Sequence, residues 1–242
     1  MKGIVLAGGT GSRLYPLTKV TNKHLLPVGG MPMIYYPIRK LTDVGIEEIL
    51  IVTGTEHMGD VVNLLGSGRE FGCRFTYKVQ DEAGGIAQAL GLAQNFCGEE
   101  SMVVLLGDNL FEMSLAEPIR SWDGAGARIL VKEVQDSTRF GVATLDGDHV
   151  VKIEEKPAHP DSSWAVTGIY FYDASVFDRI STLKPSDRGE LEITDVNNDY
   201  LREGRLHSSR MEGWWTDAGT HESYRRANAL VRERPPFPGE PE

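Results

Sequence analysis

Cysteine is scarce in this chain of 242 residues, which contains only two, Cys73 and Cys97. They form no CxxC pair, and the six histidines have no spacing typical of a zinc site. The sequence therefore predicts neither a disulfide framework nor a structural zinc ion. Because we find no secretory signal, we expect both thiols to be reduced in the cytoplasm.

Long apolar segments and clusters of positive charge are also missing. Met1 and Lys2 precede only four apolar residues, too few for the core of a secretory signal, and no stretch approaches the length of a membrane span. The net charge is −10 at pH 7, without an extended run of Lys or Arg. Nucleic acid and membrane are therefore not expected partners.

Two familiar phosphate-binding loops are absent as well. A P-loop requires Gly-Lys, a pair that occurs nowhere in the sequence. Gly9 and Gly11 match the start of a dinucleotide-binding fingerprint, but Leu14 stands where its third glycine belongs. No His-x-His pair occurs, so transfer through a covalent nucleotidyl-histidine is not expected either.

What the chain does contain is an alternation of apolar strand patterns with amphipathic helix patterns. This order predicts an α/β fold whose mostly parallel sheet is covered by helices on both faces. We expect one domain over residues 1–234 and a disordered, proline-rich tail over residues 235–242. Strands are expected at residues 3–7, 47–54, 74–80, 101–108, 127–134 and 165–173, a hairpin within 140–155, and helices at 33–45, 57–68, 85–96, 116–122, 175–183, 190–204 and 220–233.

Glycines and polar residues follow directly after several of these strands. Gly8, Gly9 and Gly11 follow the first strand and lead to Arg13. Ligands of open α/β sheets bind outside the carboxyl ends of the strands, and bare backbone N–H groups beside a guanidinium suit a phosphate. A tight turn with a surface arginine is the alternative. Comparable positions are held by Gln80, Asp108 and Asp217.

These polar residues also have structural interpretations that the spacing leaves open. Asp108 suits a magnesium ion, which prefers one or two carboxylates, but it equally suits a turn. Asp217 precedes the helix expected at 220–233, so a helix cap is its alternative role. Arg139 precedes a strand of the expected hairpin, and we interpret it as structural.

A resemblance gives these positions a more specific meaning. The segments LAGGTGSRLYPLT (residues 6–18) and NKHLLPVGGMPMIYYPI (residues 22–38) resemble the signature of the sugar-1-phosphate nucleotidyltransferases. Within that family, the chain resembles most the members that transfer a thymidylyl group to glucose 1-phosphate. The resemblance continues in order through QDEAGGIAQAL, LLGDNLF, RFGVA, EEKP, AVTGIYFYD, RGELEITDVN and WWTDAGT.

The resemblance implies a Rossmann-like, three-layer nucleotidyltransferase fold with a mostly parallel mixed sheet. It also implies Mg²⁺-dependent conversion of dTTP and glucose 1-phosphate to dTDP-glucose and pyrophosphate. A homo-oligomer is expected. Many family members continue beyond the position of residue 242 into further helices that help to bind a regulatory nucleotide sugar. If the regulatory site depends on those helices, we expect a dTDP-sugar end product to inhibit this protein by competing at the active site.

The resemblance assigns roles residue by residue. Asp108 and Asp217 are expected to hold the Mg²⁺, and Gln80 offers both a donor and an acceptor to a pyrimidine base. The catalytic residues implied are Arg13, Lys23, Asp108, Lys156 and Asp217. Nucleotide binding is implied for Leu6, Gly8, Gly9, Gly11, Ser12, Arg13, Gln80, Gly85 and Asp108, and sugar binding for Asn109, Gly141, Glu155, Lys156 and Val166.

Three other functions have some support in the sequence. Asp146 and Asp148 match the DxD motif of glycosyltransferases, but the pattern around them indicates a hairpin turn. A non-catalytic nucleotide-sugar sensor should lack the paired acids or the cations, and all are present. UTP remains an alternative substrate, because uracil differs from thymine by one methyl group, worth only ~1 kcal/mol in an apolar slot.

Overall fold

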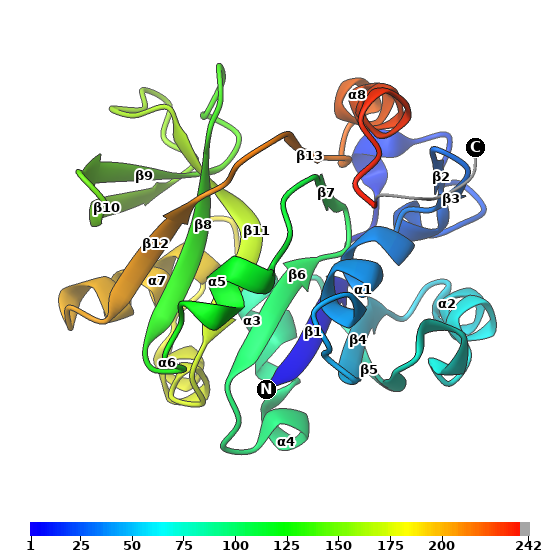
Figure 1. The fold of residues 1–242 in the computed structure, drawn as a ribbon, viewed down its shortest axis with the longest axis horizontal. Coiled ribbons are helices and arrows are strands. Elements are labelled where there is room, and N and C mark those ends of the chain that lie inside the picture. Colours follow the sequence, from blue (N-terminus) through cyan, green and yellow to red (C-terminus); the bar gives the residue numbers. More distant parts are fainter. Residues whose placement is uncertain (238–242) are drawn as a thin grey trace.

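The structure is a computed structural model that describes residues 1–237. Its centre is a mixed sheet of nine strands in the order β10-β9-β11-β6-β1-β4-β5, with β8 paired to both β11 and β12 (Figure 1). The strands are β1 (Lys2–Ala7), β4 (Glu48–Gly54), β5 (Arg74–Gln80), β6 (Met102–Leu106), β8 (Ala127–Glu133), β9 (Gly141–Asp146), β10 (His149–Glu155), β11 (Trp164–Tyr172) and β12 (Leu206–Arg210).

Strands β6, β1, β4 and β5 form the parallel half of the sheet. Leu6 of β1 pairs with Val52 on one side and with Leu106 on the other, so the carboxyl ends of these strands lie at one edge. β1 and β6 are almost completely buried, as expected for apolar strands covered on both faces. The residues that follow them therefore come together at that edge.

The other half of the sheet is largely antiparallel. β11 pairs antiparallel with β6, β8 and β9, while β12 runs parallel to β8. The hairpin expected within residues 140–155 is confirmed as β9 and β10. Asp146 lies opposite His149 across a turn in which Gly147 has a φ of +59°. The apparent DxD motif is therefore a hairpin turn, as predicted.

Helices cover both faces of the sheet and make a three-layer α/β architecture. Ile4 and Leu6 of β1 pack in one core with α3, α6 and α7, while Val5 and Ala7 pack in another with α1 and α2. The predicted fold class and its mixed sheet are confirmed. The helices are α1 (Tyr35–Thr42), α2 (Met58–Leu65), α3 (Ile86–Gly91), α4 (Gln94–Cys97), α5 (Ala116–Arg120), α6 (Val176–Thr182), α7 (Ile193–Arg202) and α8 (His221–Glu233), with 3₁₀ turns at Ser12–Leu14, Lys23–Leu25 and Arg69–Phe71.

The structure differs from the predicted elements mainly where segments are short. The helix expected at residues 85–96 is split into α3 and α4. Two small two-stranded sheets had no sequence signal, because strands of two or three residues show no periodicity. The strands of these sheets are β2 (Pro27–Val28) paired with β3 (Met31–Pro32), and β7 (Asn109–Phe111) paired with β13 (Trp215–Asp217).

Within residues 1–237, no helix combines the length and apolarity needed to cross a membrane.

The start of the proline-rich segment is packed against the domain. Phe237 is 5% exposed, and its ring stacks on Tyr36 of α1 at a centroid distance of 5.9 Å. Lys40 donates a hydrogen bond to the Pro236 carbonyl at 3.0 Å. The expected disorder is therefore wrong for residues 235–237, because one aromatic side chain buries enough apolar surface to hold them. Residues 238–242 of that prediction lie outside the described residues.

Replacing Phe237 tests whether this segment contributes to the stability of the domain. We expect Phe237→Ala to lower the free energy of unfolding by about 3 kcal/mol, because it removes a buried aromatic ring. Val151→Ala is the control, since Val151 is 54% exposed, and should change stability by less than about 0.5 kcal/mol. Urea unfolding followed by circular dichroism measures both, and equal midpoints would contradict the packed segment.

Candidate active site

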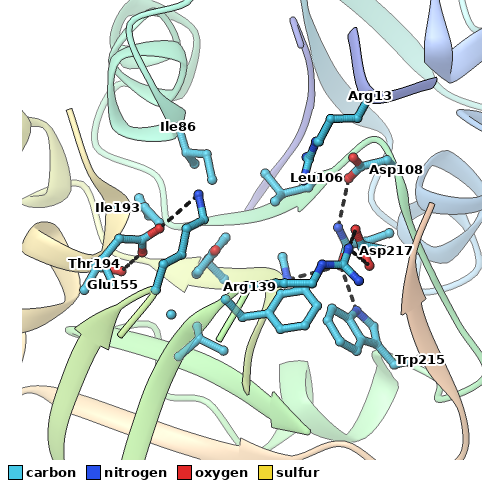
Figure 2. A pocket seen from close by; sticks show the side chains of 17 residues that line it. Arg13, Ile86, Leu106, Asp108, Arg139, Glu155, Ile193, Thr194, Trp215 and Asp217 are labelled. Atoms are coloured by element: carbon cyan, nitrogen blue, oxygen red, sulfur yellow. Dashed lines mark hydrogen bonds and ion pairs between the residues drawn. The ribbon is translucent and has the colours of Figure 1, made fainter. Parts of the chain in front are cut away.

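A cleft opens at the carboxyl edge of the parallel strands. It consists of two adjoining cavities. The β1 cavity includes Gly8, Gly9 and Gln80 in its lining, and the β11 cavity, drawn in Figure 2, includes Glu155 and Val166. The two cavities are continuous because they share lining residues. Those shared are Arg13, Ile86, Leu106, Asp108 and Lys156.

Asp108 lies at the junction of the two cavities, just after β6. Lys23 Nζ lies 2.5 Å from Asp108 Oδ2, and Asn109 Nδ2 donates to Asp108 Oδ1 at 3.1 Å. Burial alone would raise the pKa of Asp108, but the positive charge of Lys23 and these hydrogen bonds hold that pKa well below its usual value. The carboxylate is therefore ionised, with a cation already beside it.

The pairing of β13 with β7 brings Asp217 close to Asp108. Asp217 lies directly opposite Asn109 in this pair, and the Ala218 N–H donates to the Asp108 carbonyl at 2.8 Å. Arg139 Nη2 donates to both carboxylate oxygens of Asp217, at 3.0 and 3.3 Å (Figure 2). Burial and the charge of Asp108 raise the pKa of Asp217, while Arg139 lowers it. Asp217 does not cap α8, whose cap is Thr220.

Gly219 marks the point where the two carboxylates converge. A Cβ atom built there would lie 3.2 Å from Asp217 Oδ2, 3.3 Å from Arg13 Nη2 and 3.4 Å from Asp108 Oδ2. Glycine leaves this space open, and carboxylate oxygens are the ligands that Mg²⁺ prefers. Residues 1–237 hold no group of three or more Asp, Glu, His or Cys suited to a metal. Two carboxylates, completed by phosphate and water, therefore fit Mg²⁺ but not an all-protein metal cage.

The glycine-rich loop lies against the cations of the β1 cavity. A Cβ atom on Gly9 would lie 3.3 Å from Lys23 Nζ, so the bare backbone lets this amine approach. Gly11 has a φ of +66°, a conformation that favours glycine, and shapes the turn instead. Among the described residues, Gly8 and Gly9 line the cleft, whereas Gly11 and Ser12 do not.

The far end of the β1 cavity is built around an amide. Gln80 ends β5, is buried, and donates from Nε2 to the Gly85 carbonyl at 3.3 Å. A Cβ atom on Gly8 would lie only 2.3 Å from Gln80 Oε1. Leu6 and Gly85 line the same cavity. The structure thus brings together most of the residues predicted to bind the nucleotide.

The β11 cavity holds a polar network around Glu155, at the end of β10. Thr194 Oγ1 donates to Glu155 Oε2 at 2.6 Å, and Arg188 Nη2 donates to Glu155 Oε1 at 3.3 Å. Lys156 Nζ lies 3.4 Å from the same oxygen, and its backbone has a φ of +43°, unusual for a residue other than glycine. A Cβ atom on Gly141 would meet Thr194 Oγ1 at 3.2 Å. This wall offers donors and acceptors suited to hydroxyl groups.

An indole and an asparagine also line the β11 cavity. Trp215 Nε1 donates to Asn109 Oδ1 at 2.7 Å, and the Gly168 N–H donates to the same oxygen at 3.2 Å. Val166 is buried on the adjoining strand β11 and lines the β11 cavity. The predicted sugar-binding residues therefore all lie around one cavity.

Three cleft residues were missed or misread in the sequence. Arg139, interpreted there as structural, pairs with Asp217. Thr194 and Trp215 have no sequence signal of their own, although Trp215 lies two positions before Asp217 in the segment WWTDAGT. Arg139 begins the RFGVA segment of the resemblance, but no sequence spacing links it to Asp217.

Comparison with known proteins identifies the family. A family model described as nucleotidyl transferase matches residues 2–234. The chain belongs to this family. The nucleotidyl transferase is 43% identical over 238 residues to a glucose-1-phosphate thymidylyltransferase of Neisseria meningitidis, covering 96% of this chain and 83% of that relative. It is 45% identical over 236 residues to one of Xanthomonas campestris, covering 95% and 80%.

Solved structures agree with this assignment. A crystal structure from Bacillus anthracis, of a protein provisionally described as a glucose-1-phosphate thymidylyltransferase in complex with sucrose, has a TM-score of 0.93 and 60% identity, covering 96% of both chains. A UDP-glucose pyrophosphorylase complexed with UDP-glucose has a TM-score of 0.82 at 24% identity, covering 96% of this chain and 98% of that one. The second likeness shows a shared fold.

Gly8→Ala tests the close packing of Gln80 in this nucleotidyl transferase. The added methyl group would displace the amide, so we expect nucleotide affinity to fall about tenfold or more, the scale of ordinary overpacking. Gly59→Ala is the control, because a Cβ there meets no atom within 4 Å. Isothermal titration calorimetry measures both, and unchanged affinity in Gly8→Ala would contradict the packing.

Proposed function

We propose that this nucleotidyl transferase transfers a thymidylyl group from dTTP to glucose 1-phosphate, forming dTDP-glucose and pyrophosphate. The observation that carries the proposal is the convergence of Asp108, Asp217 and Arg13 on one open point between two cavities. One cavity then takes the nucleotide and the other takes the sugar phosphate. The names of the relatives at 43% and 45% identity support the choice of substrates.

The chemistry joins two anions, so the cleft must suppress their repulsion. Lys23 lies beside Asp108 in the β1 cavity, and Arg13 and Lys156 line both cavities. These three positive charges flank the place where the phosphates must meet. Fixed cations at such a point stabilise the charge that develops on the transferring group and on the departing pyrophosphate.

The attacking atom needs no general base, because a phosphate oxygen of glucose 1-phosphate is already ionised. A bond forms between this oxygen and the α-phosphorus as the bond from that phosphorus to pyrophosphate breaks. Glu155 and Thr194 would hold the sugar hydroxyls, and Gln80 would face the base, which aligns the two substrates. A bound Mg²⁺ would neutralise phosphate charge, and Asp108 and Asp217 are the residues that would hold it.

Pyrophosphate release tests the proposal. With glucose 1-phosphate and Mg²⁺, we expect dTTP to be the best of the nucleoside triphosphates. UTP should follow at a modest disadvantage, because its uracil base lacks the methyl contact of thymine, worth ~1 kcal/mol. A preference for ATP or GTP, or no pyrophosphate with any pair, would overturn the proposed function.

Asp217→Asn tests the role of the second carboxylate. The amide keeps the size of the side chain but removes its charge. We expect a folded protein whose turnover falls about 10²-fold or more, the scale of losing one preorganised charge. The Mg²⁺ concentration for half-maximal activity should also rise. Steady-state kinetics over a Mg²⁺ series measures both effects.

Asp146→Asn is the matched control for this experiment. Asp146 is exposed in the β9–β10 turn and carries the same charge. Its replacement should leave turnover and Mg²⁺ dependence unchanged. Loss of activity in this variant with normal Asp217→Asn turnover would favour the DxD alternative instead.

The remaining expectations belong to the same proposal. We infer that the protein acts in the cytoplasm as a homo-oligomer, as the resemblance implies. A dTDP-sugar product should compete with dTTP, because it carries the same base and the same first two phosphates. Both statements rest on the resemblance and on product chemistry.

A further inference from the structure

The amide of Gln80 is held in one orientation by two acceptors. Its Nε2 donates to Gln88 Oε1 at 2.6 Å and to the Gly85 carbonyl at 3.3 Å. The Gly85 carbonyl is part of the backbone at the start of α3, where it also accepts from the Ala89 N–H at 3.2 Å. A flipped Gln80 amide would turn its oxygen against this fixed carbonyl. The nitrogen therefore faces Gly85 and Gln88.

The oxygen of the same amide faces the opposite way, toward the cavity. Gln80 Oε1 lies over Gly8, where a Cβ atom would come within 2.3 Å of it. Gly8 and Gln80 both line the β1 cavity. In the part of the chain that the structure describes, no protein group donates to this oxygen, whereas both amide N–H groups have acceptors. What Gln80 offers a ligand is therefore an acceptor.

Gln88 is itself firmly placed. It stands on α3, and its side-chain amide lies flat on Gly84, where a Cβ atom would approach it to between 2.6 and 2.9 Å. The loop that carries Gly84 is pinned from both sides, because Leu191 N–H donates to the Gly84 carbonyl at 2.8 Å and Ala87 N–H donates to the Leu191 carbonyl at 3.2 Å. Because Gly8 and Gly84 have no Cβ, the hydrogen-bonded amides of Gln80 and Gln88 can lie directly against the backbone.

We propose that Gln88 is a positioning residue that sets the base preference of the nucleotide site. By accepting from Gln80 Nε2, it keeps Gln80 Oε1 toward the base. An acceptor there pairs with the N3–H of thymine or uracil and opposes the N3 lone pair of cytosine. A site with a fixed polar group discriminates strongly against a base that leaves this group unpaired. The inference rests on the proposed function, because that function places the base beside Gln80.

Nucleotide binding without sugar phosphate tests this inference separately from catalysis. We would measure the dissociation constants of dTTP and dCTP by isothermal titration calorimetry. Wild-type protein should prefer dTTP by about 10²-fold or more, the order expected when a built hydrogen bond is lost. Gln88→Met keeps the volume but removes the acceptor, and should reduce this preference about tenfold or more.

Two further variants separate positioning from a general structural effect. Gln88→Glu retains an acceptor for Gln80 Nε2 and should keep the preference within about threefold of wild type, even if its charge weakens both nucleotides. Gln94→Met changes an exposed glutamine on α4 and should match wild type. A folded Gln88→Met protein with the wild-type preference would overturn the role of Gln88.

A measurement on wild-type protein keeps the inference testable if Gln88→Met does not fold. A dTTP analogue methylated at N3 lacks the donor, and should bind about 100-fold or more weakly than dTTP. Equal binding of the analogue would overturn the proposed orientation of Gln80. Absence of turnover with dTTP and glucose 1-phosphate would instead contradict the proposed function. The binding ratios would still decide the orientation of Gln80, because they are measured without turnover.

Discussion

Two carboxylates held close to one point repel each other, and the cleft depends on how that repulsion is balanced. Lys23 pairs with Asp108, Arg139 pairs with Asp217, and Arg13 approaches both acids beside Gly219. Like charges at short range raise a pKa, which is the effect that Asp108 has on Asp217. The cations therefore do two things: they lower the pKa values of the two acids, against the effect of burial, and they bring positive charge to the junction.

The same balance explains why the acids and cations come from distant parts of the chain. Asp108 follows a parallel strand, Arg139 precedes β9, and Asp217 ends β13. No single element could place all of them, because their side chains point into the cleft from different sides (Figure 2). The cleft forms only when the parallel and antiparallel halves of the sheet have folded together.

Much of the fold could be predicted because long elements carry a periodic signal. β1, β4 and α8 were expected within a residue or two of their bounds, and Gln80 and Asp108 were expected at strand ends. The pairing of β7 with β13 could not be predicted, since three residues show no period and the register depends on tertiary contacts.

Some residues of the candidate site could be predicted from the sequence, and others could not. The loop of the β1 cavity has a glycine pattern that can be read directly. Glu155 and Val166 of the β11 cavity stand on ordinary strands, so only the resemblance singled them out. Arg139 contacts Asp217, which is distant in the sequence, and Gln88 contacts Gln80 on another element. No spacing reveals such partners. The catalytic and binding roles of all these residues stay predictions.

Asp217 is anchored on both sides along the chain. Before it, β13 is paired with β7; after it, α8 begins with Thr220, whose side chain accepts from the Ser223 N–H in a capping box. The backbone that carries this carboxylate therefore has little conformational freedom. The conformational entropy of placing it was lost once, during folding, rather than each time substrates arrive. The fold therefore places this carboxylate before any ligand binds.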